Sequence, residues 1–262
     1  MGVNSMLTIS DNYNIQMHNY KKKIIQPTFR SNYQLTEDIL SLSKVTRNAT
    51  CFFRSDLDWK KFCKLILKTF KNSKNANIVC VGCSDGSEPT SLLLKLLQFK
   101  AFRNEPQKFK QIKAYDIDEK QIEIAKSYKI PLINNPLDCI FDYYSLFKHA
   151  LKGLNKTYYI KNGKLELAEN LKEKIQYEIK EISEVINNLP RDEKVVLLAR
   201  NIFPYLDDFF CFPRVMQGLS KLKKGSVLAI GDFDKAKIPD FEKMIMDQGY
   251  EKSKVKNCFI KK

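Results

Sequence analysis

Short apolar runs alternate with helically spaced apolar residues through the centre of this chain. Residues 78–81 form an apolar run that ends at a glycine, and leucines at positions 92–94, 96 and 97 follow at the density of a buried helix. Residues 112–114 repeat the run, and Asp118 then precedes a segment whose apolar positions predict a capped helix. Two consecutive strand–turn–helix units predict a parallel βαβ arrangement.

The same pattern continues on both sides of this unit. Upstream, lysines and apolar residues occupy opposite faces of residues 56–70, which predicts an amphipathic helix. Downstream, a helix should end near Leu222, and the last strand should be antiparallel. The downstream strands are predicted at residues 175–179, 195–198, 226–230 and 255–260. Together these elements predict an α/β fold with a Rossmann-like, doubly wound and mostly parallel sheet.

The pattern divides the chain into a lead and a main domain. Residues 1–47 are polar and basic, with one predicted helix at residues 36–43, and form a short N-terminal helical or irregular lead. Residues 48–262 form the main domain. Within it, residues 130–171 lose the βαβ pattern, and Asn162-Gly163 lies between alternating runs, which indicates a hairpin. We therefore expect a small inserted β-subdomain there.

Bulk composition narrows the class of protein. The chain has 262 residues, of which 44% are hydrophobic, enough for one sizeable core. It contains no run of about 18 apolar residues and no secretory apolar stretch at its start, so we expect no membrane insertion and a cytoplasmic protein. Cys80 and Cys83 form an isolated CxxC without a second pair or a nearby histidine, so we expect buried thiols rather than a metal site.

The formal charge of +15 has two interpretations. Lysine greatly outnumbers arginine and is spread along the whole chain, which favours a solvated lysine-rich surface. The second interpretation is an acidic protein partner. Nucleic acid is disfavoured, because its readers concentrate arginine and aromatic residues in one region. The sequence contains no signal for an oligomeric state.

Candidate ligand-binding residues lie in the turns that follow two predicted strands. The turn from Gly82 to Gly86 allows close approach of a ligand to the backbone, although ordinary loop geometry explains it equally well. Asp116 ends the next strand, where a carboxylate can accept hydrogen bonds from a ribose diol. The alternative role, a helix N-cap, is already filled by Asp118.

Three other polar residues have two interpretations each. Glu88 lies near a predicted helix start, where it either interacts favourably with the helix dipole or receives the ammonium group of a ligand. Arg54, beside Thr50, is a surface ion-pair residue or holds a carboxylate. Asn201 follows the strand 195–198, and so is either a turn residue or a ligand contact at the carboxyl edge of the sheet.

Taken together, these motifs resemble those of the CheR-type chemotaxis-receptor methyltransferases, which use S-adenosylmethionine (SAM). The resemblance runs from about Asn48 to Gly231 and implies the SAM-dependent methyltransferase fold. It rests on Asn48-x-Thr50-x-Phe-Phe53-Arg54, Gly82-Cys-Ser-Asp-Gly-Ser-Glu88-Pro89, Ala114-Tyr-Asp116-Ile-Asp118, Arg200-Asn201-Ile-Phe-Pro-Tyr205 and Lys223-Lys-Gly225.

The resemblance implies methyl transfer from SAM to a glutamate carboxylate of a protein, with S-adenosylhomocysteine (SAH) as product. The implied partner is an acidic protein, such as a chemoreceptor cytoplasmic helix, and the inserted hairpin is similar to the family's receptor-docking β-subdomain. Arg200 and Tyr205 would orient the acceptor. The implied cofactor-binding residues are Asn48, Thr50, Arg54, Gly82, Glu88, Asp116, Asn201 and Ile202.

Two other functions stay open because the chain departs from the family pattern. Asp85 and Ser87 replace the family's Thr and first Glu, and its G-H-S-E segment reads Gly231-Asp-Phe-Asp234 here. A SAM-binding sensor or adaptor without turnover fits such divergence. Alternatively, Asn201-Ile-Phe-Pro204-Tyr205 resembles the N-P-P-Y loop of amine methyltransferases, which would make nitrogen the acceptor.

Overall fold

The computed structural model describes residues 50–105, 107–109, 111–132 and 157–262. The helices are α3 (Trp59–Thr69), α4 (Ser87–Leu96), α5 (Lys100–Arg103), α6 (Glu119–Ser127), α8 (Glu169–Lys172), α9 (Ile182–Asn187), α10 (Cys211–Ser220), α11 (Asp232–Lys237) and α12 (Phe241–Asp247), with the 3-10 helix η2 (Phe203–Tyr205). The predicted N-terminal lead, including the helix at residues 36–43, lies outside the described residues.

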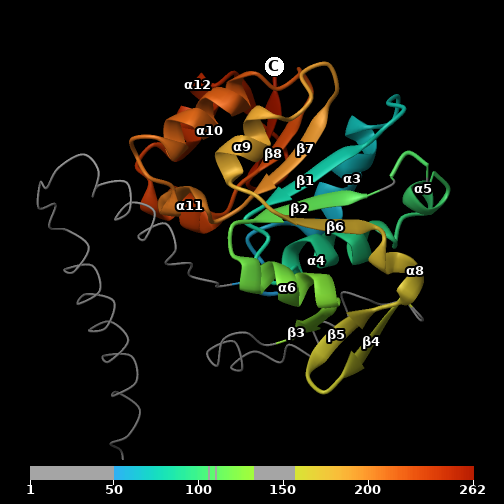
Figure 1. Ribbon diagram of the computed structural model, residues 1–262. Helices are drawn as coiled ribbons and strands as arrows, with labels where there is room; N and C mark the ends of the chain where they lie inside the picture. Colours follow the sequence, from blue (N-terminus) through green and yellow to red (C-terminus); the bar gives the residue numbers. More distant parts are fainter. Residues whose placement is uncertain (1–49, 106, 110, 133–156) are drawn as a thin grey trace, which may run out of the picture. The chain divides into compact units, whose positions relative to one another are not determined.

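Seven strands form the main sheet, in the order β6-β2-β1-β7-β8-β10-β9 (Figure 1). Its first five strands in this order pair in parallel, whereas β10 is antiparallel to both β8 and β9. The strands are β1 (Asn77–Val81), β2 (Ile112–Asp116), β6 (Ile175–Ile179), β7 (Val195–Ala199), β8 (Val227–Ala229), β9 (Tyr250–Lys252) and β10 (Cys258–Lys261). This confirms the predicted doubly wound sheet with a late antiparallel strand.

Alternating side chains of each central strand enter two separate cores. On β1, Ile78 and Cys80 pack in the core that contains α3, α4 and α6. Val79 and Val81 pack in the core that contains α9, α10 and α12. Figure 1 shows α4 and α6 on one side of the sheet and α9 and α10 on the other. A strand buried on both faces needs a continuous apolar run, which is why residues 78–81 were recognisable.

A second sheet of three antiparallel strands has the order β3-β5-β4. Its strands are β3 (Lys129–Pro131), β4 (Tyr158–Lys161) and β5 (Lys164–Leu167). Asn162 and Gly163 connect β4 to β5 with φ of 51° and 68°, the left-handed conformations that a tight hairpin turn requires. The predicted hairpin is therefore present, and the division of the chain into domains stays a prediction.

Hydrogen bonds at the ends of the elements set their observed limits. Asp58 accepts a hydrogen bond from Lys61 N at 3.0 Å, so α3 begins at Trp59 rather than at residue 56. Asp118 caps α6 through Lys120 N and Gln121 N, as predicted. Cys258 N donates to Val255 O, which closes a turn and delays the last strand to residue 258.

Cys80 and Cys83 are both buried, in agreement with the prediction of buried thiols. Burial raises the pKa of both thiols, so neither is poised as a thiolate. Within the part of the chain that the structure describes, no helix combines the length and the apolar character that a membrane span needs.

Candidate functional site

Three neighbouring strands bring the predicted residues to one edge of the main sheet. Strand β1 pairs with β2 on one side, with Val81 opposite Tyr115, and with β7 on the other, with Val81 opposite Ala199. Because parallel strands end at the same edge, Gly82, Asp116 and Arg200 follow these paired residues at neighbouring positions.

Asp116 connects the end of β2 to the turn after β1. Its Oδ2 accepts a hydrogen bond from Ser84 N at 2.7 Å, and its Oδ1 accepts one from Asp118 N at 3.0 Å. Burial raises the pKa of Asp116, and the main-chain N–H groups of Ser84, Ile117 and Asp118 oppose that shift. An ionised carboxylate has about four acceptor positions, so capacity for a ligand hydroxyl remains.

Glu88, Arg200 and Asp56 form a buried ionic cluster. Arg200 donates from one guanidinium nitrogen to Glu88 Oε2 at 2.5 Å and from the other to Asp56 Oδ1. The side chain of Arg200 has 0% exposure and lies over the Trp59 ring, 5.3 Å from its centroid. Burial raises the pKa of Glu88, whereas the positive charges of Arg200 and Arg54 act to lower it.

The motif that runs from Asn48 to Arg54 lies against this cluster in its described part, residues 50–54. Arg54 is half-buried, and its charge acts on both Asp56 and Glu88. Its carbonyl accepts a hydrogen bond from Trp59 Nε1 at 3.1 Å. Phe53 N donates to Ser91 Oγ in α4 at 3.0 Å, which joins the motif to the helix that carries Glu88. Thr50 is half-buried, and Asn48 lies outside the described residues.

Asn201 is fixed by residues from the far end of the chain. Its backbone has a positive φ of 59°, and its main-chain N–H donates to Asp234 Oδ2 at 2.7 Å. Its side chain accepts from Phe233 N at 2.9 Å and donates to Asp56 Oδ2 at 3.2 Å. A Cβ on Gly231 would lie 1.9 Å from Asn201 Oδ1, so glycine is required there. The amide of Asn201 therefore organises this edge.

Gly82 and Ile202 are in direct contact. Gly82 has φ of +66°, and a Cβ added to it would lie 2.4 Å from Ile202 Cγ2. Positive φ and the packing of Ile202 therefore both require glycine at this position. Tyr205 in η2 is 48% exposed and stacks on Phe233, with centroids 5.7 Å apart.

Backbone strain alone should cost Gly82→Ala about 1–2 kcal/mol of the free energy of unfolding. We expect a larger loss, because the added Cβ also meets Ile202. Gly163 provides a matched control, because its φ of +68° is nearly the same and nothing lies within 4 Å of an added Cβ. Chemical denaturation of Gly82→Ala, Gly163→Ala and wild type measures the difference. Equal losses in the two variants would refute the tight packing of Ile202 on this turn.

Asp56 and Asp234 are central to this edge, and neither was among the predicted site residues. Asp234 accepts from the main-chain N–H groups of Gly231, Asn201 and Phe203. Burial raises the pKa of Asp234 to about 6. The only signal for it was its place in the Gly231-Asp-Phe-Asp234 segment. For Asp56 no motif was available, since its partners lie more than 140 residues away.

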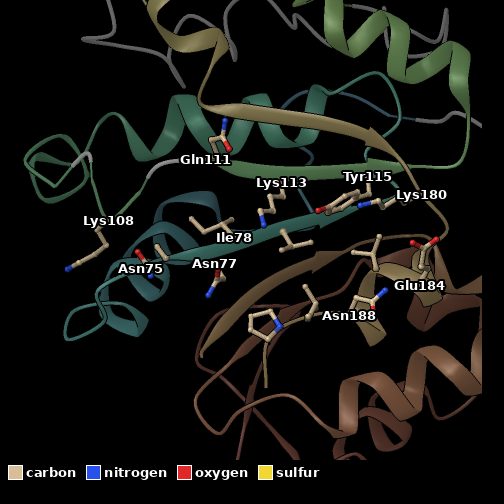
Figure 2. Close-up of a pocket in the computed structure, with 15 residues that line it drawn as sticks. Asn75, Asn77, Ile78, Lys108, Gln111, Lys113, Tyr115, Lys180, Glu184 and Asn188 are labelled. Atoms are coloured by element: carbon tan, nitrogen blue, oxygen red, sulfur yellow. The ribbon is translucent and has the colours of Figure 1, made fainter. Parts of the chain in front are cut away.

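A groove of about 380 Å³ lies elsewhere, over the sheet face between β2 and α9. Figure 2 shows Lys113, Tyr115 and Lys180 along it, with Glu184 and Asn188 on the opposite wall. The residues that line it include none of the predicted site residues. The groove is therefore lined by other side chains than the predicted site, although its Lys180 donates a main-chain hydrogen bond to Asp116 O at 3.0 Å.

Two methyltransferases are among the solved structures that the chain matches. The bifunctional kinase-methyltransferase WbdD is 14% identical, with a TM-score of 0.44, over 85% of this chain and 45% of that one. CalS10, an amino pentose methyltransferase from Micromonospora echinaspora solved with bound SAM, is 11% identical, with a TM-score of 0.31, over 78% and 57% of the two chains. This chain spans 40 to 47% of the length of the first WbdD chains matched.

The family comparison covers most of the chain. Residues 48–250 match the model of the CheR methyltransferase SAM-binding domain, a span that includes all five segments that carry the resemblance. It also includes the ionic cluster and Asp234. The chain belongs to the CheR methyltransferase family and carries that family's SAM-dependent methyltransferase domain, with SAM as its cofactor.

Proposed function

We propose that this protein transfers the methyl group of SAM to a glutamate side-chain carboxylate of a protein, with a chemoreceptor-like helix as the acceptor. The observation that carries the proposal is the convergence of Asp116, Glu88 and Asn201 at one sheet edge within a matched CheR domain. The identity of the acceptor rests on the family alone.

The residues at this edge fit the cofactor. Asp116 keeps acceptor capacity beside the Gly82 turn, as a ribose diol requires. Among the described residues, Ser87 Oγ at the start of α4 and Arg200 Nε are buried polar atoms without a hydrogen-bond partner. Buried polar atoms are rarely left unpaired, so unused hydrogen-bonding capacity at this edge is consistent with a ligand site.

In this proposal Asp116 holds the ribose, Glu88 receives the ammonium group, and Arg54 holds the carboxylate of the cofactor's amino-acid part. Asn48 and Thr50 contribute further polar contacts, as in the family. Asn201 and Ile202 shape the edge, because the side chain of Asn201 is engaged by Asp56 and Ile202 packs on Gly82.

When bound, SAM supplies an electrophilic methyl group on a sulfonium centre. An ionised glutamate is already a nucleophile, so the chain needs to align the acceptor and exclude water rather than supply a base. Tyr205, half-exposed and stacked on Phe233, is the proposed acceptor-orienting residue. Arg200, with a fully buried side chain, is proposed to act through Glu88 and Asp56 as a positioning residue.

Positive charge beside Tyr205 supports an acidic acceptor. Helix α11 packs beside η2, and Lys237 Nζ of α11 lies 5.6 Å from the Phe233 ring centroid. The stacked pair of Tyr205 and Phe233 therefore carries a cation at its margin. Such a surface attracts an acidic helix at low ionic strength.

The chemistry of the product tests the proposal. The protein is incubated with methyl-labelled SAM and a synthetic helical peptide that contains paired glutamates, with a glutamine-for-glutamate peptide as control. We expect label on the glutamate peptide alone, released as methanol by mild base, because methyl esters hydrolyse and methylamines do not. Base-stable label would make nitrogen the acceptor. SAH binding without any transfer would favour the sensor or adaptor.

A further inference from the structure

Asp56 is the residue where four separate segments meet. Its Oδ1 accepts from Arg200 at the end of β7, and its Oδ2 accepts from Asn201 Nδ2 and from Asp232 N at the start of α11, both at 3.2 Å. Its carbonyl accepts from Asn257 Nδ2 at 2.7 Å. Within the part of the chain that the structure describes, the three groups that bond the Asp56 carboxylate are donors, and they come from two segments that are distant in the sequence.

These contacts complete a bridge across the carboxyl edge. On one side of the bridge, Phe53 N is bonded to Ser91 in α4. On the other side, Asp56 is bonded to the residues that follow β7 and to α11. Between them lies Arg54, which the proposed function assigns to the cofactor carboxylate. The segment 53–56 thus links α4 to the residues that follow β7 and to the start of α11.

The positive charges around Asp56 favour its ionised form. The guanidinium of Arg200 is shared between Asp56 and Glu88, and the charge of Arg54 acts on both carboxylates. Two cations and two anions thus balance in a cluster where the Asp56 side chain is only 13% exposed. Burial acts to raise the pKa of Asp56, but Arg200, Asn201 and Arg54 together hold it below its usual value.

We propose that Asp56 is a positioning residue for cofactor binding: it holds Arg54 and the segment 53–56 across the carboxyl edge by anchoring them to Arg200, Asn201 and Asp232. This inference rests on the proposed function, because that function assigns Arg54 to SAM. Asp56 belongs to none of the motifs that carry the family resemblance.

Asp56→Asn is the sharpest perturbation of this bridge. The amide keeps the size of the side chain, but its NH2 group must face one of the donors that the carboxylate accepts. Asp58→Asn is the matched control, since it removes the same charge two residues away. Asp58 caps α3 through Lys61 N, and asparagine is an equally good cap.

Hydrogen exchange of the ligand-free protein tests the bridge without any ligand. The amide of Asp232 donates directly to Asp56. Asparagine can present its amide oxygen at either carboxylate position, so Asp56→Ala is measured beside Asp56→Asn. Asp56→Ala should speed the exchange of the Asp232 amide by at least about 10-fold, the loss expected for one hydrogen bond to a charged group. Asp58→Asn should leave that rate unchanged, and unchanged exchange at residue 232 in Asp56→Ala would overturn the bridge.

Calorimetric titration with SAH tests the effect on the cofactor. We expect Asp56→Asn to raise the Kd by at least about 10-fold, and Asp58→Asn to change it by less than about 2-fold. A role in stability alone would lower the melting temperature of Asp56→Asn but leave the Kd of the folded protein unchanged, and that result would overturn the positioning role. A wild type that bound no SAH would refute the proposed function instead, while the exchange result would still decide the bridge.

Discussion

Asp116→Ala should weaken SAH binding at least about 100-fold while the protein stays folded. The carboxylate is proposed to accept two hydrogen bonds from the ribose, and each hydrogen bond to a charged group contributes about 1.5–3 kcal/mol. Alanine removes both acceptors at once. Calorimetric titration of the variant and of wild type with SAH measures the ratio of their Kd values.

Asp118→Asn is the control for this loss. Asp118 lies two residues away and caps α6, a role that asparagine fills equally well. Its Kd for SAH should stay within about 2-fold of wild type. Because Asp116 also accepts from Ser84 N and Asp118 N, a far-ultraviolet spectrum should confirm that Asp116→Ala is folded. A folded Asp116→Ala with wild-type affinity would remove Asp116 from the cofactor site.

Arg200→Ala should lower the free energy of unfolding by about 3–5 kcal/mol, the range for breaking a buried ion pair. The loss comes from the two carboxylates that would be left buried and unpaired, as well as from the lost attraction itself. Glu88 and Asp56 would remain in place with side chains that are 10% and 13% exposed and with no guanidinium between them. Chemical denaturation with a linear extrapolation measures this loss.

Two further variants separate this explanation from a general effect of arginine removal. Arg103→Ala removes an exposed arginine whose guanidinium donates to the Leu97 carbonyl, and should change stability by less than about 1 kcal/mol. Adding Glu88→Gln to Arg200→Ala removes one of the unpaired charges, so the double variant should lose less than the sum of the single losses. Strict additivity would show that Arg200 and Glu88 do not act as a pair.

The central strands β1 and β7 were predictable because they are buried on both faces, and β6 because its apolar residues alternate with polar ones. β1, β6 and β7 are continuous or alternating apolar runs, and their predicted and observed limits differ by at most one residue. The short elements were missed for the opposite reason. α9 has six residues and β9 has three, which is too few for the hydrophobic period of a helix or of a strand to be recognised. The start of β10 was set by a turn at Val255 that apolar pattern cannot reveal.

The site residues that could be predicted are those whose chemistry suits a ligand and that also lie at the end of a predicted strand. Gly82, Asp116 and Asn201 each follow a predicted strand, and parallel pairing brings them to one edge. What could not be predicted is the set of contacts that each side chain makes. Arg200 was predicted to orient the acceptor, and the structure adds that its side chain is fully buried between two carboxylates. Its partner Asp56 is 144 residues away, and no local pattern encodes such a contact.

The most direct test of the cofactor site is calorimetric titration of the wild-type protein with SAH, compared with adenosine. The account predicts saturable one-to-one binding of SAH and at least about 10-fold weaker binding of adenosine, which lacks the amino-acid part assigned to Glu88 and Arg54. A well-folded protein that binds neither molecule would contradict the assignment of a SAM site to the carboxyl edge of this sheet.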